Sequence, residues 1–89
     1  MPHPNGIVVH GDVQIGPNCL IFQQVTIGFG KGGVPIVGAA VDIGAGAKVI
    51  GAIRIGDGAI IGANAVVLID VPAGAVAIGN PARLAHRAS

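Results

Sequence analysis

The stretch IGAGAKVIGAIRIGDGAIIGANAV, residues 43–66, repeats one pattern every six residues. It divides into IGAGAK, VIGAIR, IGDGAI and IGANAV, so each unit begins with Ile or Val and carries a small or aliphatic residue at its fifth position. Branched side chains favour extended backbone, so the first position of each unit marks a short strand. Gly and Asn tolerate the positive-φ corners at which a chain turns. The stretch predicts short strands joined by tight corners, because a helix would show apolar residues three and four apart.

The same six-residue register extends in both directions from this stretch. Its first position holds Val9, Ile15, Ile21, Ile27, Val37, Ile43, Val49, Ile55, Ile61 and Val67. Its fifth position holds Val13, Cys19, Val25, Val41, Ala47, Ile53, Ala59, Ala65 and Val71, and only Lys31 breaks the pattern. Three units per turn make a prism in which residues 18 apart stack, as Ile43 on Ile61 and Ala45 on Ala63. The sequence therefore predicts an all-β fold, one parallel β-helix over residues 1–89, whose ends need caps.

Composition narrows the possible functions. The formal charge of +1 gives no strong field for nucleic acid. The most apolar window, 58–69, is too short to span a membrane and contains Gly62 and Asn64. One cysteine excludes an intrachain disulfide framework, and a cytoplasmic location is the default without a secretory signal. A chain of 89 residues buries little surface alone, so we expect it to self-associate.

One interruption breaks the repeat. The spacing from Ile27 to Val37 exceeds one unit by four residues, and the segment between them, GFGKGGVPI (28–36), predicts an inserted loop at one corner. Such loops often carry function, although a tolerated surface insertion is the alternative. The segment contains four glycines, whose backbone N–H groups we predict to be open to a ligand: Gly28, Gly30, Gly32 and Gly33. The literal G-x-G-x-x-G match does not indicate a dinucleotide site, because Pro35 and the resumed repeat preclude the helix that must follow.

Three segments resemble the hexapeptide-repeat acyltransferases, and within them the serine O-acetyltransferases. They are HPNGIVVHGDVQIGPNCLIFQQVTIG (3–28), IGAGAKVIGAIRIGDGAIIGANAVVLIDVPAG (43–74) and GNPAR (79–83). The resemblance implies a left-handed β-helix that assembles as a homotrimer, with acetyl-coenzyme A between adjacent prisms as the acyl donor. It also implies direct transfer of the acetyl group to a hydroxyl of a small-molecule acceptor, without a metal. Residues 79–89 are then the C-terminal cap, predicted as a tail or short helix.

The resemblance also assigns roles to single residues. His3, in a His-x-x-Gly-Ile-Val context, matches the catalytic histidine that removes the hydroxyl proton. The positions that match coenzyme contacts are Gly28 and Gly30 at the thioester, Ala45 and Ala63 at the pantetheine arm, and Lys48 and Arg83 at the phosphates.

The chain departs from the family pattern around the acceptor. Pro2 stands where an acidic residue precedes the catalytic histidine, and Val34 stands where a second histidine precedes Pro35. The family's helical N-terminal domain and the carboxylate that orients the histidine are expected upstream of residue 1. Two alternatives therefore stay open. One is acetyl transfer to a sugar or another hydroxyl or amine, and the other is a truncated, non-catalytic trimerising module.

The remaining polar candidates are interpreted as structural. His10 is predicted to be a surface residue, His86 a solvated residue of the C-terminal tail, and Cys19 a core residue. A β-helix can hold zinc between subunits, but His3, His10 and His86 do not have the spacing of such a site. The sequence therefore predicts no metal.

Overall fold

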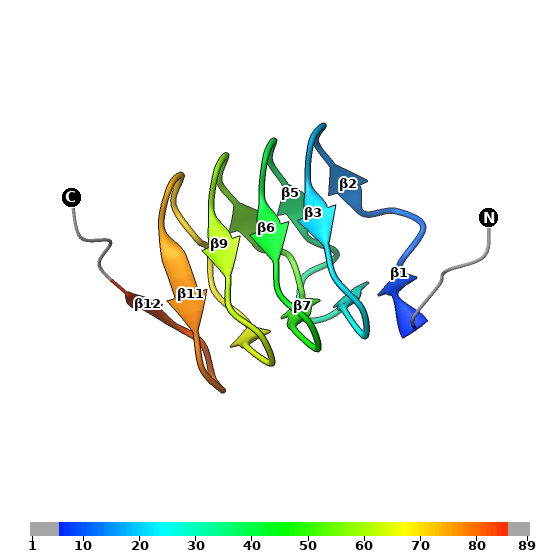
Figure 1. Cartoon of the computed structure of the whole chain (residues 1–89). Coiled ribbons are helices and arrows are strands. Elements are labelled where there is room, and N and C mark those ends of the chain that lie inside the picture. The colour runs from blue at the N-terminus through cyan, green and yellow to red at the C-terminus, as the bar shows by residue number, and fades with distance from the viewer. Residues whose placement is uncertain (1–5, 86–89) are drawn as a thin grey trace.

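The computed structural model describes residues 6–85, and in this range the chain winds into stacked coils of short strands (Figure 1). The strands are β1 (Val8–Val9), β2 (Gln14–Ile15), β3 (Leu20–Ile21), β4 (Thr26–Gly28), β5 (Ile36–Val37), β6 (Asp42–Ile43), β7 (Lys48–Ile50), β8 (Arg54–Ile55), β9 (Ile60–Ile61), β10 (Val66–Val67), β11 (Val76–Ile78) and β12 (Arg83–Ala85). No helix in this range is long and apolar enough to cross a membrane.

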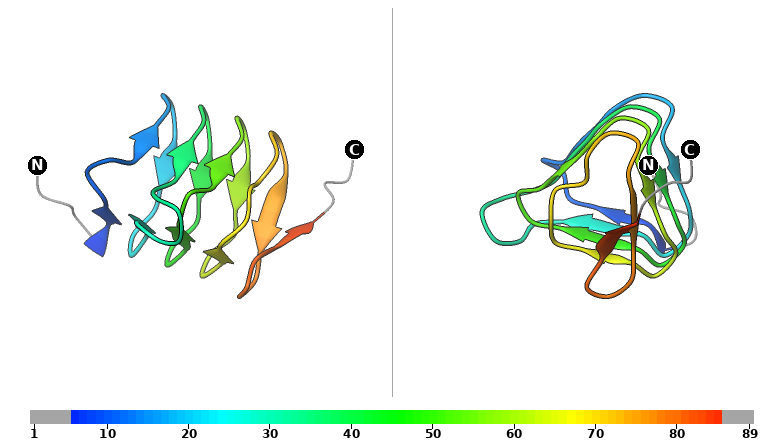
Figure 2. Two further views of the ribbon diagram at one scale, coloured as in Figure 1. Left: turned by 180° about the vertical axis from the view of Figure 1, so that it is seen from behind. Right: turned by 90° about the vertical axis from the view of Figure 1, so that its left-hand side faces the viewer.

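The strands form three sheets, one on each side of a prism. Sheet A has the order β1-β4-β7-β10, sheet B the order β2-β5-β8, and sheet C the order β12-β11-β9-β6-β3. All pairs except β11 with β12 are parallel, and Ile43 pairs with Ile61, 18 residues on. The view along the axis shows the triangular outline and the left-handed path of the chain (Figure 2). The predicted left-handed parallel β-helix is confirmed.

The core is the interior of the prism, and the six-residue register fills it. First-position and fifth-position side chains alternate inward, and Val25, Ile27, Val41 and Ile43 have no exposed surface. Cys19 is half-buried against this core, and its thiol donates a hydrogen bond to the carbonyl of Gly38 at 3.2 Å. A period of six therefore yields continuous burial, because each coil places one large and one small side chain on every side.

The last coil is shorter than the repeat predicts. Val71 was expected at a fifth position, but it pairs with Ile55, 16 residues earlier, and so occupies a first position. The chain cuts the corner after β10 with only Leu68, Ile69 and Asp70 between the two inward residues Val67 and Val71. Both valines remain buried, so apolar burial decides the register against the sequence period.

The C-terminal segment also differs from the expected tail or short helix. Up to Ala85 it turns back at Gly79, whose φ is +97°, and forms β12 antiparallel to β11. Without β12 the last strand of sheet C would present unpaired N–H and C=O groups, and these groups favour pairing with a returning strand. The cap is therefore a strand within residues 6–85.

One corner carries avoidable backbone strain, which leads to a stability prediction. Ala40 has a φ of +57°, where an L-residue with a Cβ costs about 1–2 kcal/mol. Replacing Ala40 with Gly should raise the free energy of unfolding by about 0.5 kcal/mol, after the greater freedom of glycine in the unfolded chain is subtracted. Ala39→Gly, one residue earlier and without positive φ, should lower it in the same urea titration. Equal shifts in both variants would contradict this account.

Candidate functional site

The inserted loop is a closed hairpin at the edge between sheets A and B. The N–H of Gly30 donates to the carbonyl of Gly33 at 2.9 Å, and the N–H of Gly33 donates back to Gly30 at 3.2 Å. The carbonyl of Lys31 accepts the N–H of Ala52 at 3.2 Å, and Pro35 is fully buried below. Two hydrogen bonds therefore close the loop on itself, and a third joins its tip to the neighbouring coil.

This hairpin corrects the expectation that all the loop glycines present open N–H groups. Gly30 and Gly33 use theirs on each other, because a hairpin this short closes on its own backbone. Within residues 6–85 the N–H of Gly32 donates to no acceptor. A Cβ on Gly30 would lie 2.9 Å from the Cα and N atoms of Gly51. Gly30 is thus required for close packing, and Gly32 is the glycine of this loop whose N–H has no acceptor within residues 6–85.

The corner between sheets C and A forms a second feature, the glycine–alanine edge, made of residues 44–46 and 62–64. The N–H of Asn64 donates to the carbonyl of Ala45 at 2.8 Å, which confirms that Ala45 and Ala63 belong to stacked corners. In the described chain the N–H groups of Ala45 and Ala63 donate to no acceptor. At the edge between sheets B and C, by contrast, the N–H of Ala39 donates to Asp57 Oδ1 at 2.8 Å. Within residues 6–85 the glycine–alanine edge thus leaves the N–H groups of two stacked alanines available.

The glycine–alanine edge is open because neighbouring positions lack side chains. A Cβ on Gly44 would lie 2.7 Å from the N atom of Ala63, so the coils approach too closely for any other residue. Phe22 lies one coil before Gly44 along this edge and is 51% exposed, and its N–H donates to the carbonyl of Ile43. The sequence analysis did not select Phe22 as a site residue. The signal that could have found it is its place at the second position of a six-residue unit, which usually holds glycine.

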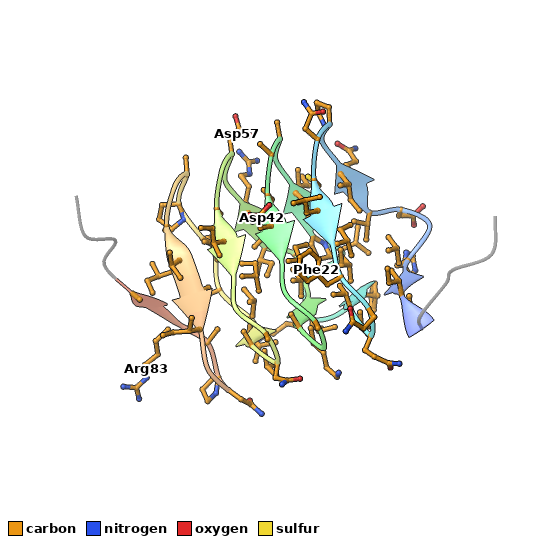
Figure 3. All side chains as sticks on the ribbon, in the orientation of Figure 1. Phe22, Asp42, Asp57 and Arg83 are labelled. Carbon is orange, nitrogen blue, oxygen red and sulfur yellow. The ribbon has the colours of Figure 1, made fainter. Side chains whose placement is uncertain are left out.

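The charged candidates lie near the same edge. Arg83 pairs in register with Ile78, which directly precedes the corner of the last coil, and its side chain projects from the C-terminal end (Figure 3). Lys48 is exposed on the outer side of sheet A, in register with Val66. The structure thus places Arg83 in line with the glycine–alanine edge and Lys48 on the sheet that begins there.

The remaining candidates are not gathered with this group. Gly28 and Gly30 lie at the opposite edge of sheet A, where the loop begins. His3 and His86 lie outside the described residues. His10 is exposed, as predicted, and its Nδ1 accepts the N–H of Asp12 at 3.1 Å. Its ring lies 6.3 Å from the ring of Phe29 in the loop. Among residues 6–85 no three His, Cys, Asp or Glu side chains gather as a metal site would require.

A pocket of about 440 Å³ lies on the outer side of sheet B, next to the loop. It is lined by Val34, Ile36, Ala52, Ile53, Arg54 and Asp70. Asp70 Oδ1 accepts the backbone N–H of Arg54 at 2.9 Å. Neither charged residue was a sequence candidate, because Asp70 reaches this place only through the shortened last coil.

Known proteins resemble this chain along most of its length. A serine acetyltransferase of Helicobacter pylori is 45% identical over 86 residues, which cover 91% of this chain and 50% of the relative. One of Mycobacterium tuberculosis is 45% identical over 87 residues, covering 92% of this chain and 38% of the relative. The chain thus spans half or less of the length of these relatives. No protein-family model matches it.

Solved structures agree with the sequence relatives. A serine acetyltransferase in complex with cysteine superposes with a TM-score of 0.86 at 45% identity, over 91% of this chain and 35% of that one. A serine acetyltransferase in complex with CoA has a TM-score of 0.83 at 49% identity, over 90% of this chain and 33% of that one. In its repeat, its fold and its sequence, the chain is therefore similar to the β-helix part of serine acetyltransferases.

Proposed function

We propose that this chain is the coenzyme-binding and acyl-transfer part of a serine acetyltransferase-type enzyme. It binds acetyl-coenzyme A as donor substrate and transfers the acetyl group to the hydroxyl of a small-molecule acceptor, L-serine first, a reaction of cysteine biosynthesis. The observation that carries the proposal is the pair of available N–H donors at Ala45 and Ala63, stacked on an edge kept open by glycines. The solved relative in complex with CoA supports the same ligand.

The chemistry of the coenzyme fits this edge. The pantetheine arm is an extended chain with two amide groups, and backbone N–H groups repeated once per coil can donate to amide carbonyls, as a sheet edge does to an added strand. Gly44 adds no side chain that would block the arm. Lys48 and Arg83 are the cations near this edge, and both are exposed and able to bind phosphate oxygens.

The transfer step is general-base catalysis. His3 accepts the proton of the acceptor hydroxyl as its oxygen attacks the thioester carbonyl. The tetrahedral oxyanion is stabilised by backbone donors of the loop, of which the N–H of Gly32 is one available group. When the intermediate collapses, the C–S bond breaks, the sulfur takes up a proton and the acetyl ester leaves. No step requires a metal.

The assembly is proposed to be a homotrimer in the cytoplasm. Exposed aromatic side chains, Phe22 and Phe29, favour association over an isolated prism. The loop and the glycine–alanine edge lie at opposite edges of sheet A of one chain. In a trimer, acetyl-coenzyme A can therefore be enclosed between the prisms of two neighbouring chains. The free thiol of Cys19 fits a reducing compartment.

A second candidate function keeps the donor and changes the acceptor to a sugar or to another hydroxyl or amine. Val34 favours it, because this residue, in the position of the family's second histidine, lines the sheet B pocket with an apolar side chain. A non-catalytic trimerising module is the third possibility. It predicts trimers without turnover.

Release of free thiol from acetyl-coenzyme A tests the proposal. The protein should release thiol with L-serine and more slowly with a panel of sugars and amines. If only another acceptor supports thiol release, that acceptor and not L-serine is the substrate. Trimers that release no thiol with any acceptor would support the non-catalytic module and overturn the proposed activity.

The glycine–alanine edge gives a sharper prediction at Ala63, which is exposed on it. Ala63→Tyr should raise the KM for acetyl-coenzyme A about tenfold, equivalent to about 1.4 kcal/mol, because the ring covers the open corner. The kcat should change little. Ala73→Tyr provides the control, since Ala73 is exposed at the edge between sheets B and C. If both variants raise the KM equally, the coenzyme does not lie along this edge.

A further inference from the structure

The outer row of sheet B brings together residues that no motif connects. Gln14 pairs with Ile36, and Ile36 pairs with Arg54, so the three side chains form one outward row. Asp70 extends the row, because Val71 after it pairs with Ile55 after Arg54. An 18-residue turn would bring residue 72 rather than Asp70 next to Arg54. The shortened coil therefore places a carboxylate beside a guanidinium at the pocket.

The two charges are arranged without neutralising each other. Asp70 uses one oxygen on the backbone N–H of Arg54, which leaves its second oxygen available. Arg54 makes no ion pair with any side chain of residues 6–85. Both side chains are exposed at the pocket, and Val34, Ile36 and Ala52 supply apolar surface. The pocket thus presents one positive group and one negative group beside an aliphatic wall.

We propose that Arg54 and Asp70 are the specificity-determining residues of the acceptor site and bind the α-carboxylate and the α-ammonium group of a zwitterionic amino acid. This inference rests on the proposed function. A simple anion would meet the carboxylate of Asp70, and a simple cation would meet the guanidinium of Arg54. A sugar would leave both charges without a partner. A molecule carrying both charges satisfies both groups, and the planar guanidinium suits a carboxylate.

The position of the pocket agrees with this role. Ala52 lines the pocket and lies directly beside the tip of the loop. A Cβ added to Gly32 would lie only 3.2 Å from the Cβ of Ala52. Val34, at the end of the loop, forms another wall. An amino acid held by its two charges would therefore direct its side-chain hydroxyl toward the loop that carries the available Gly32 N–H. The loop separates this pocket from sheet A, where Lys48 lies.

Substrate analogues that each lack one charge give the decisive test. L-Serine should be a better acceptor than ethanolamine, which lacks the carboxylate, and than 3-hydroxypropionate, which lacks the ammonium group. Arg54→Gln should raise the KM for L-serine about tenfold or more and remove the preference over ethanolamine. Asp70→Asn keeps an oxygen for the Arg54 N–H and should remove the preference over 3-hydroxypropionate. Gln14→Ala, in the same outward row but outside the pocket, should change neither preference.

The outcomes separate this inference from the proposed function. Binding of L-serine without acetyl-coenzyme A, measured by calorimetry on the same variants, is independent of turnover. Serine-dependent turnover with unchanged KM values in Arg54→Gln and Asp70→Asn would overturn the inference and leave the function standing. Loss of L-serine binding in both variants of a protein that shows no turnover would support the pocket and overturn the function. Arg54→Lys should restore part of the affinity for L-serine, and if it restores none, the role of Arg54 is structural.

Discussion

Replacing Ile43 with Ala should lower the free energy of unfolding by about 3 kcal/mol. Ile43 has no exposed surface, and it stacks in sheet C between Ile21 and Ile61 of the adjacent coils. Truncation removes buried methyl groups and leaves a cavity that the rigid backbone ladder on both sides prevents from collapsing. The measurement is urea denaturation followed by circular dichroism at a fixed protein concentration.

Leu20→Ala is the matched control for this core prediction. Leu20 belongs to the same sheet, has the same number of carbon atoms and is 55% exposed. Its truncation should change the free energy of unfolding by less than about 0.5 kcal/mol, as expected for surface positions. A large loss at Leu20 together with a small loss at Ile43 would mean that the inward and outward faces are exchanged.

Turnover should fall about 10²- to 10⁴-fold when His3 is replaced with Ala, because the acceptor hydroxyl then loses its general base. The KM for acetyl-coenzyme A should stay within about twofold, since a base that acts on the acceptor contributes to the transition state and not to donor binding. Steady-state thiol release at saturating L-serine measures both constants. The prediction rests on the His-x-x-Gly-Ile-Val context of His3.

His10→Gln tests whether the effect is specific to the catalytic base. His10 is exposed and contacts the loop through the ring of Phe29, so its replacement should leave kcat within about threefold. If kcat is unchanged in His3→Ala, His3 is not the base. An equal loss in both variants would point to a general disturbance of the chain near the loop.

The core could be predicted from the sequence because burial and period are tied together. A branched residue every sixth position leaves one register that buries it, so Ile43 on Ile61 followed directly. The insertion was equally visible, since Ile27 pairs with Val49, 22 residues on, which is one 18-residue turn and the four-residue excess. The fate of the loop N–H groups was not visible, because the hydrogen bonds between Gly30 and Gly33 depend on how the hairpin closes.

The sequence alone determined the three-sided prism and its 18-residue stacking, because local periodicity and side-chain burial specify both. Three of its segments also carried the resemblance to the serine O-acetyltransferases. The tertiary structure alone decided that the last coil is 16 residues long, and hence that Asp70 lies beside Arg54. The shortened coil keeps both Val67 and Val71 buried, so the apolar pattern in the sequence shows no break. The outward residues that follow are nevertheless shifted in register relative to the preceding coil. Polar neighbours on the surface are set by the fold's register, and that register is settled by packing in three dimensions.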